Sequence, residues 1–121
     1  MKRKQLDLAK RALQLAPQLL KKGEGLEELR LYEFDGDEEA HDDELTQRLY
    51  DEFSAEAERV REALTKKYGQ PSRAGTSGDR AVKLNGVFRY ALWDVEGSRL
   101  FVAAHHEDRG VPVILWIGIV D

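Results

Sequence analysis

Apolar side chains near the start of the chain recur with the period of a helix. In residues 3–15 they return every three or four positions, as expected for an amphipathic helix with one broad buried face. Two adjoining stripes make up that face: Leu6, Ala9, Leu13 and Ala16, and Leu8, Ala12, Leu15 and Leu19. Pro17 lacks the backbone N–H that a helix interior uses. We therefore predict that the helix stops or kinks at Pro17, with a short further turn through Leu20 that ends at Gly23.

A longer apolar stripe predicts a second helix over residues 45–68. Its members are spaced three and four apart: Leu45, Leu49, Phe53, Ala57, Val60, Leu64 and Tyr68. Asp42 or Asp43 is expected to cap its N-terminus, and Gly69 and Pro71 to end it. At 1.5 Å per residue such a helix is about 40 Å long, enough to cross a small sheet.

The C-terminal third, Val87 to Val120, predicts a three-stranded antiparallel meander. Three runs of β-branched and aromatic residues are separated by turn signals at residues 96–98 and 107–110. Asn85-Gly86 is a hairpin signal. We therefore predict a short extra strand over Ala81–Leu84 that leads into Val87.

The segment Leu26–Phe34 (LEELRLYEF) is more ambiguous. Its alternation favours a strand with Leu29 and Leu31 on one face and Arg30, Tyr32 and Phe34 on the other, and a helix remains the alternative. Residues 70–80 are rich in turn formers and predict a mobile connector. The predicted order is therefore α-β-α-β-β-β. It indicates one α+β domain over residues 1–121, an antiparallel sheet packed with a long central helix and an N-terminal helix.

The predicted strands are apolar on both faces. In the last strand Val113, Leu115, Ile117 and Ile119 point one way, and Ile114, Trp116 and Val120 point the other. A half-solvated sheet would alternate apolar with polar residues, so both faces need cover. Helices could lie on opposite faces, or helix and loop could wrap both. Alternatively, helices cover one face and a partner or second copy covers part of the other. If Val111–Val120 is an edge strand, it also invites strand addition.

Charge is distributed very unevenly. The net charge is −4, yet residues 1–22 carry seven basic residues and one acidic residue, and residues 24–44 carry eleven acidic residues and one basic residue. Nucleic-acid binding is not expected, because phosphate contacts need a concentrated basic surface without an acidic neighbour. The acidic run Asp35–Glu44 (DGDEEAHDDE) predicts a solvated loop, and its charge suits a cationic partner.

Composition excludes several other classes. The chain has no cysteine, which excludes disulfides, zinc fingers and thiol nucleophiles and favours a cytoplasmic location. The start MKRKQ is not followed by the apolar core of a signal peptide. No run approaches the roughly 20 apolar residues of a membrane span, so no membrane partner is expected.

Two motifs suggest chemistry at first sight. His105-His106 precedes Glu107-Asp108, but adjacent strand residues point to opposite faces, so the two imidazoles cannot converge on one metal without a bulge. A small enzyme that uses His105 or His106 with Asp108 stays open as an alternative.

The acidic run also begins like an EF-hand loop, with Asp35, Asp37 and Glu39 at alternating positions. Its sixth position is Ala40 instead of Gly, and its twelfth is Thr46 instead of Glu. No metal or cofactor is therefore expected.

The leading hypothesis is a non-enzymatic protein-binding module. In size, acidity, lack of cysteine and helix-plus-sheet layout the chain resembles the immunity proteins that neutralise bacterial toxins. The resemblance implies a toxin partner and carboxylates placed against a basic surface. The residues expected to contact the partner are Asp35, Asp37, Glu38, Glu39, Asp42 and Asp43. The alternative is a homodimeric structural or adaptor protein, joined through the spare apolar face or the Val111–Val120 edge.

Overall fold

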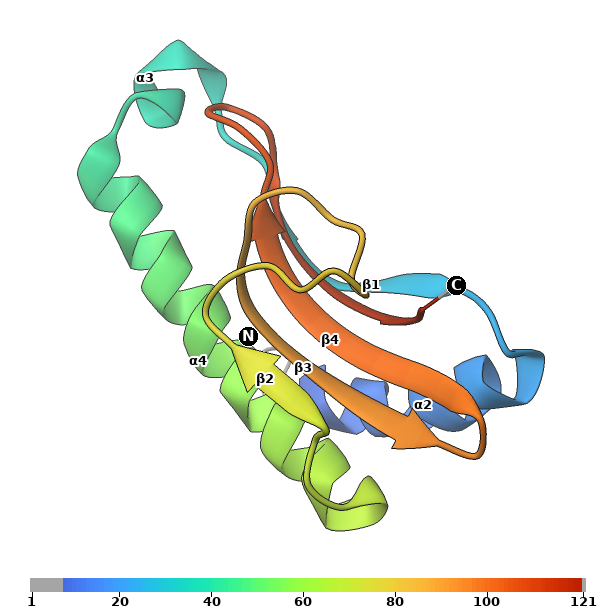
Figure 1. Ribbon diagram of the computed structural model, residues 1–121. Coiled ribbons are helices and arrows are strands. Elements are labelled where there is room, and N and C mark those ends of the chain that lie inside the picture. The colour runs from blue at the N-terminus through green and yellow to red at the C-terminus, as the bar shows by residue number, and fades with distance from the viewer. Residues whose placement is uncertain (1–7, 121) are drawn as a thin grey trace.

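The computed structural model describes residues 8–120 and has an α+β fold, as predicted. Its elements, in chain order, are α2 (Leu8–Lys22), β1 (Leu26–Tyr32), α3 (Gly36–Ala40), α4 (Asp43–Tyr68), β2 (Arg73–Gly75), β3 (Val87–Val95), β4 (Ser98–His106) and β5 (Val113–Ile119). The strands form one antiparallel sheet in the order β1-β5-β4-β3-β2 (Figure 1). The predicted meander β3-β4-β5 is its centre, and β1 and β2 are its edges.

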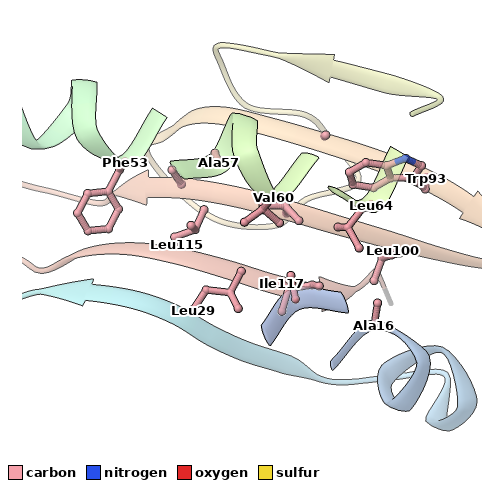
Figure 2. Close-up of a cluster of buried hydrophobic side chains, with 14 of the residues drawn as sticks. Ala16, Leu29, Phe53, Ala57, Val60, Leu64, Trp93, Leu100, Leu115 and Ile117 are labelled. Atoms are coloured by element: carbon pink, nitrogen blue, oxygen red, sulfur yellow. The ribbon is translucent and has the colours of Figure 1, made fainter. Parts of the chain in front are cut away.

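Helices α2 and α4 both pack on one face of the sheet, called here the inner face. The predicted stripe of α4 is buried from Leu45 to Leu64, and it packs with Ala12, Ala16 and Leu19 of α2. Figure 2 shows the centre of this core, where α4 side chains meet those of the strands. The residues labelled there are Ala16, Leu29, Phe53, Ala57, Val60, Leu64, Trp93, Leu100, Leu115 and Ile117. This layer is the main hydrophobic core.

Helix α2 continues through Pro17 to Lys22, so of the predicted stop or kink the stop is wrong. Proline removes one hydrogen bond of the helix interior. The next turn nevertheless buries Leu19 against the sheet, and Ala16 is buried on the same face, which compensates for the loss. The end at Gly23 is correct: its φ is +74°, and its N–H donates to the Leu19 carbonyl at 2.8 Å. Residues 3–7 of the predicted helix lie outside the described residues.

Strand β1 is a strand, as favoured, but the predicted faces are partly wrong. Leu29 is an extra residue in the register with β5, because Glu28 pairs with Trp116 and Arg30 with Leu115. This bulge turns Leu29 and Arg30 toward the same side. Leu29 enters the inner core, whereas Leu31 is 40% exposed.

The opposite, outer face of the sheet is closed by a loop instead of a helix. Residues 76–86, called here the covering loop, pass in front of the sheet in Figure 1, with α2 behind it. Val82 is buried in a second cluster on β3 and β4 that contains Val87, Leu92, Phe101 and Ala103. The expected arrangement with helices on opposite faces is therefore wrong, because both helices lie on the inner face and a loop covers part of the outer face.

Two further predictions are wrong, and the condition for strand addition at the last strand is not met. Ala81–Leu84 belongs to the covering loop and is not a strand. The extra strand is β2, which lies within the predicted connector and pairs with β3 at Tyr90–Leu92. Strand β5 is not an edge strand, because it pairs with β4 on one side and with β1 on the other.

Candidate functional site

The acidic run Asp35–Glu44, called here the acidic lobe, lies at the end of β1 and leads into α4 (Figure 1). The prediction of a solvated loop is partly wrong, because Gly36–Ala40 forms the short helix α3. Gly36 supplies a φ of +79° at its start. The carboxylates of the first turn lie at the positive end of the helix dipole, which favours a helix despite the like charges.

Glu39 holds the lobe to the sheet. Its Oε1 accepts a hydrogen bond from the Tyr32 hydroxyl at 2.7 Å and from the Asp35 backbone N–H at 2.8 Å. The Asp35 N–H, and then the Tyr32 hydroxyl, lower the pKa of Glu39. The same bond raises the pKa of Tyr32, because it depends on the phenol keeping its proton. Glu39 is therefore a structural carboxylate.

Asp42 and Asp43 also have contacts within the chain. Asp42 is the N-cap of α4, as predicted, and its Oδ1 accepts from the Leu45 N–H at 3.0 Å. Asp43 lies 3.5 Å from a guanidinium nitrogen of Arg109, which also donates to the Ala40 carbonyl at 3.2 Å. Arg109 thus ties the β4–β5 turn to the lobe.

Asp35, Asp37 and Glu38 complete the predicted partner-binding set and are exposed, as are Asp42 and Asp43. None of their side chains forms an ion pair within residues 8–120. The six predicted residues thus lie close together in the structure. Glu39, Asp42 and Asp43 have contacts within the chain, although Asp42 and Asp43 are also exposed, and Asp35, Asp37 and Glu38 form no ion pair within residues 8–120.

The two histidines point to opposite faces, as predicted, and have unrelated partners. His105 is buried on the outer face, with Nδ1 2.8 Å from the Asn85 carbonyl. His106 lies on the inner face, with Nδ1 2.7 Å from the Tyr50 hydroxyl, and burial lowers its pKa. The Asp108 carboxylate accepts from the Arg109 N–H within its own turn. The hydrogen bonds among the described residues therefore do not join either imidazole to Asp108.

The structure also bears on metal binding and on membrane-spanning helices. Within residues 8–120 no three His, Asp or Glu side chains are grouped to hold a metal ion. None of the helices in the same range is long and apolar enough to span a bilayer.

Sequence reasoning missed two carboxylates. Glu56 is buried within α4, where Oε1 lies 2.7 Å from Arg59, and Arg30 of β1 is 3.9 Å from its other oxygen. Its spacing of three from Phe53 and four from Val60 could have placed it on the buried face. Asp79 of the covering loop has no comparable signal, because it lies in an irregular segment without helical or strand periodicity.

Comparison of the chain with protein-family models, curated proteins and solved structures finds no match.

Proposed function

We propose that this chain is a non-enzymatic, cytoplasmic protein-binding module whose acidic lobe contacts a basic surface of a protein partner, in the manner of an immunity protein. The observation that carries the proposal is the division of the lobe. Glu39 and Asp42 are used in hydrogen bonds that fix its shape. Asp35, Asp37 and Glu38 are exposed beside them, at the N-cap and in the first turn of α3.

Preorganisation supports binding in this arrangement. A lobe fixed by Glu39 and Arg109 loses less conformational freedom on association than an unstructured acidic tail would. Exposed carboxylates of one sign also speed the encounter with a cationic surface, and they do so most at low salt. The expected interaction is thus fast to form and sensitive to ionic strength.

The test is a triple variant, Asp35→Asn/Asp37→Asn/Glu38→Gln, which removes three exposed charges and leaves Glu39, Asp42 and Asp43 in place. A partner is first captured with the wild-type chain, identified by mass spectrometry and purified. Its Kd is then measured against salt concentration by calorimetry. We expect the triple variant to weaken binding about tenfold at low salt and to flatten the salt dependence.

The matched control is Asp51→Asn/Glu62→Gln/Glu96→Gln, which changes net charge by the same amount at exposed positions outside the lobe. It should bind within about twofold of wild type, since long-range attraction is screened beyond about 10 Å at 0.1 M salt. Equal weakening of binding by both variants would mean that affinity depends on the net charge of the chain and not on the position of the carboxylates. If the lobe variant binds with wild-type affinity, the exposed carboxylates of the lobe do not contact the partner.

A homodimer is the second candidate, favoured by the uncovered part of the outer face. Leu26 and Leu31 of β1 are 45% and 40% exposed, beside the half-buried Ile114 and Trp116 of β5. The predicted alternative through a β5 edge is excluded, because β5 is internal. Light scattering over a concentration series tests the remaining alternative, a homodimer through the uncovered part of the outer face. A dimer that Leu31→Glu dissociates supports it, and a monomer at every concentration removes it.

A further inference from the structure

The covering loop leaves a hollow at the start of β1, at the other end of that strand from the acidic lobe. The hollow has a volume of about 460 Å³ and lies between the end of α2, the first residues of β1 and residues 81–84. Its apolar walls are Leu26, Leu84, Phe101 and Val120. Ligand sites for small molecules have volumes of a few hundred Å³ and mostly apolar walls. The size is thus that of a small-molecule site, and the lining combines the apolar walls with the charged residues Lys22, Glu24, Glu27 and Lys83.

Gly118 of β5 explains why this hollow exists. It is buried, and a Cβ there would come within 2.8 Å of Leu26 Cδ1 and 2.9 Å of the Gly25 carbonyl. With no side chain at this point of β5, Leu26 can lie over the strand and form one wall. The covering loop supplies the opposite wall through Leu84.

A second hollow, of about 680 Å³, adjoins the first and shares Ala81, Lys83 and Val120 with it. Its lining is mainly basic and consists of Arg73, Arg80, Lys83 and Arg99 together with Asp79. The two hollows therefore adjoin at these three residues and are together called the depression, with the apolar walls in the first hollow and most of the cations in the second.

The carboxylate of Asp79 is already occupied. It lies 3.0 Å from Arg73, and it accepts from the Tyr90 hydroxyl and the Ala81 N–H, each at 2.9 Å. The Ala81 N–H in particular lowers the pKa of Asp79 and keeps the carboxyl ionised. Within residues 8–120, Arg80, Lys83 and Arg99 form no ion pair.

Other charged residues determine at which end of the depression an anionic group is expected to bind. Glu24 and Glu27 line the apolar hollow beside Lys22, on the side of β1. Asp94 is the register partner of Arg99 across β3 and β4, but the two side chains form no ion pair. An anionic group is therefore repelled from the β1 side and attracted toward Lys83 and Arg99.

We propose that this depression binds an amphipathic anion, with its aliphatic chain in the hollow lined by Leu26, Leu84 and Phe101 and its carboxylate or phosphate at Lys83 and Arg99. Burial of each methylene adds affinity, and the cations select an anionic head. The site is separate from the acidic lobe and does not depend on the proposed protein partner. Both functions can therefore fail or hold independently.

The test is a titration of the isotope-labelled chain, followed by NMR, with decanoate below its micelle concentration. We expect amide shifts centred on residues 81–84, Leu26 and Val120. Affinity should rise steadily from butyrate to decanoate, and decyl phosphate should bind as well as or better than decanoate. Decyltrimethylammonium, which has the same chain and the opposite charge, should bind at least tenfold more weakly.

The protein-side test is the double variant Lys83→Gln/Arg99→Gln, with Lys10→Gln/Lys66→Gln as a control of equal charge change on exposed helix positions. The first should weaken decanoate binding about tenfold, and the second should leave it within twofold. A thermal midpoint close to that of wild type confirms that each variant is folded.

Four results would overturn the proposal. The cationic surfactant binding as tightly as decanoate would leave only a non-selective apolar surface. Inorganic phosphate alone binding as tightly as decyl phosphate would leave only an anion site. Wild-type affinity in the Lys83/Arg99 variant, or shifts located on Leu31 and Ile114 instead, would place the ligand elsewhere.

Discussion

The two faces of the sheet are both apolar, but they are covered by different means. The inner face is covered by α2 and α4, whose repeated stripes fill the space with large side chains (Figure 2). The outer face is covered by eleven loop residues that bury one valine, Val82, over β3 and β4 (Figure 1). A helix presents a side chain to the sheet every three or four residues, whereas a short loop covers only what it crosses. The exposed leucines Leu26 and Leu31 are accordingly on the outer face.

The largest expected effect comes from the inner face. Leu64→Ala removes a side chain that is fully buried between α4 and the sheet, so it should lower the free energy of unfolding by about 3 to 5 kcal/mol. Leu31→Ala, the same change on the uncovered part of the outer face, should cost less than about 1 kcal/mol. Denaturant unfolding of both variants measures the difference, and similar losses would mean that the outer face is covered in solution.

A matched pair of valines sharpens the comparison. Val60 of α4 and Val82 of the covering loop are both buried, at 0% and 3% exposure. Val60→Ala should cost about 2 to 3 kcal/mol, because the helix cannot move into the cavity, and Val82→Ala about 1 kcal/mol, because the loop can relax toward the sheet. Unfolding midpoints at constant m-value measure both. A loss at Val82 as large as the loss at Val60 would mean that the covering loop relaxes no more than the helix does.

The smallest expected effect is a pH dependence that originates on the inner face. Burial beside Tyr50 and Phe34 lowers the pKa of His106 in the folded chain, so the unfolded chain takes up this proton first. Stability should therefore fall as pH decreases below about 6.5 and level off once the folded-state pKa is passed. His106→Gln should remove that part of the pH profile, and His41→Gln, at an exposed position, should retain it. Identical profiles for wild type and His106→Gln would contradict the assignment.

Much of the fold could be predicted from periodicity. The α4 stripe, its Asp42 cap and the three strands of the meander were each predicted near their observed bounds. The failures share a cause. Pro17 is accommodated because of burial on the sheet, and the Leu29 bulge arises from pairing with β5. Both depend on contacts between segments far apart in the chain, which outweigh local preference.

The candidate site divides in the same way. The sequence located the acidic run, because charge density is a local property. It could not separate Asp35, Asp37 and Glu38 from the carboxylates that hold the lobe, since the partners of the latter include Tyr32 and Arg109. The two hollows were also beyond prediction, because their walls come from α2, β1, β4, β5 and the covering loop.

The sequence by itself determined the long helix α4, the three strands of the meander and where the carboxylates gather, because side-chain period and charge are local properties. Only the tertiary structure decided that both helices share one face, that β1 lies beside β5, and which charges remain available to other molecules. These outcomes depend on which distant surfaces bury each other, and no repeat along the chain encodes that choice.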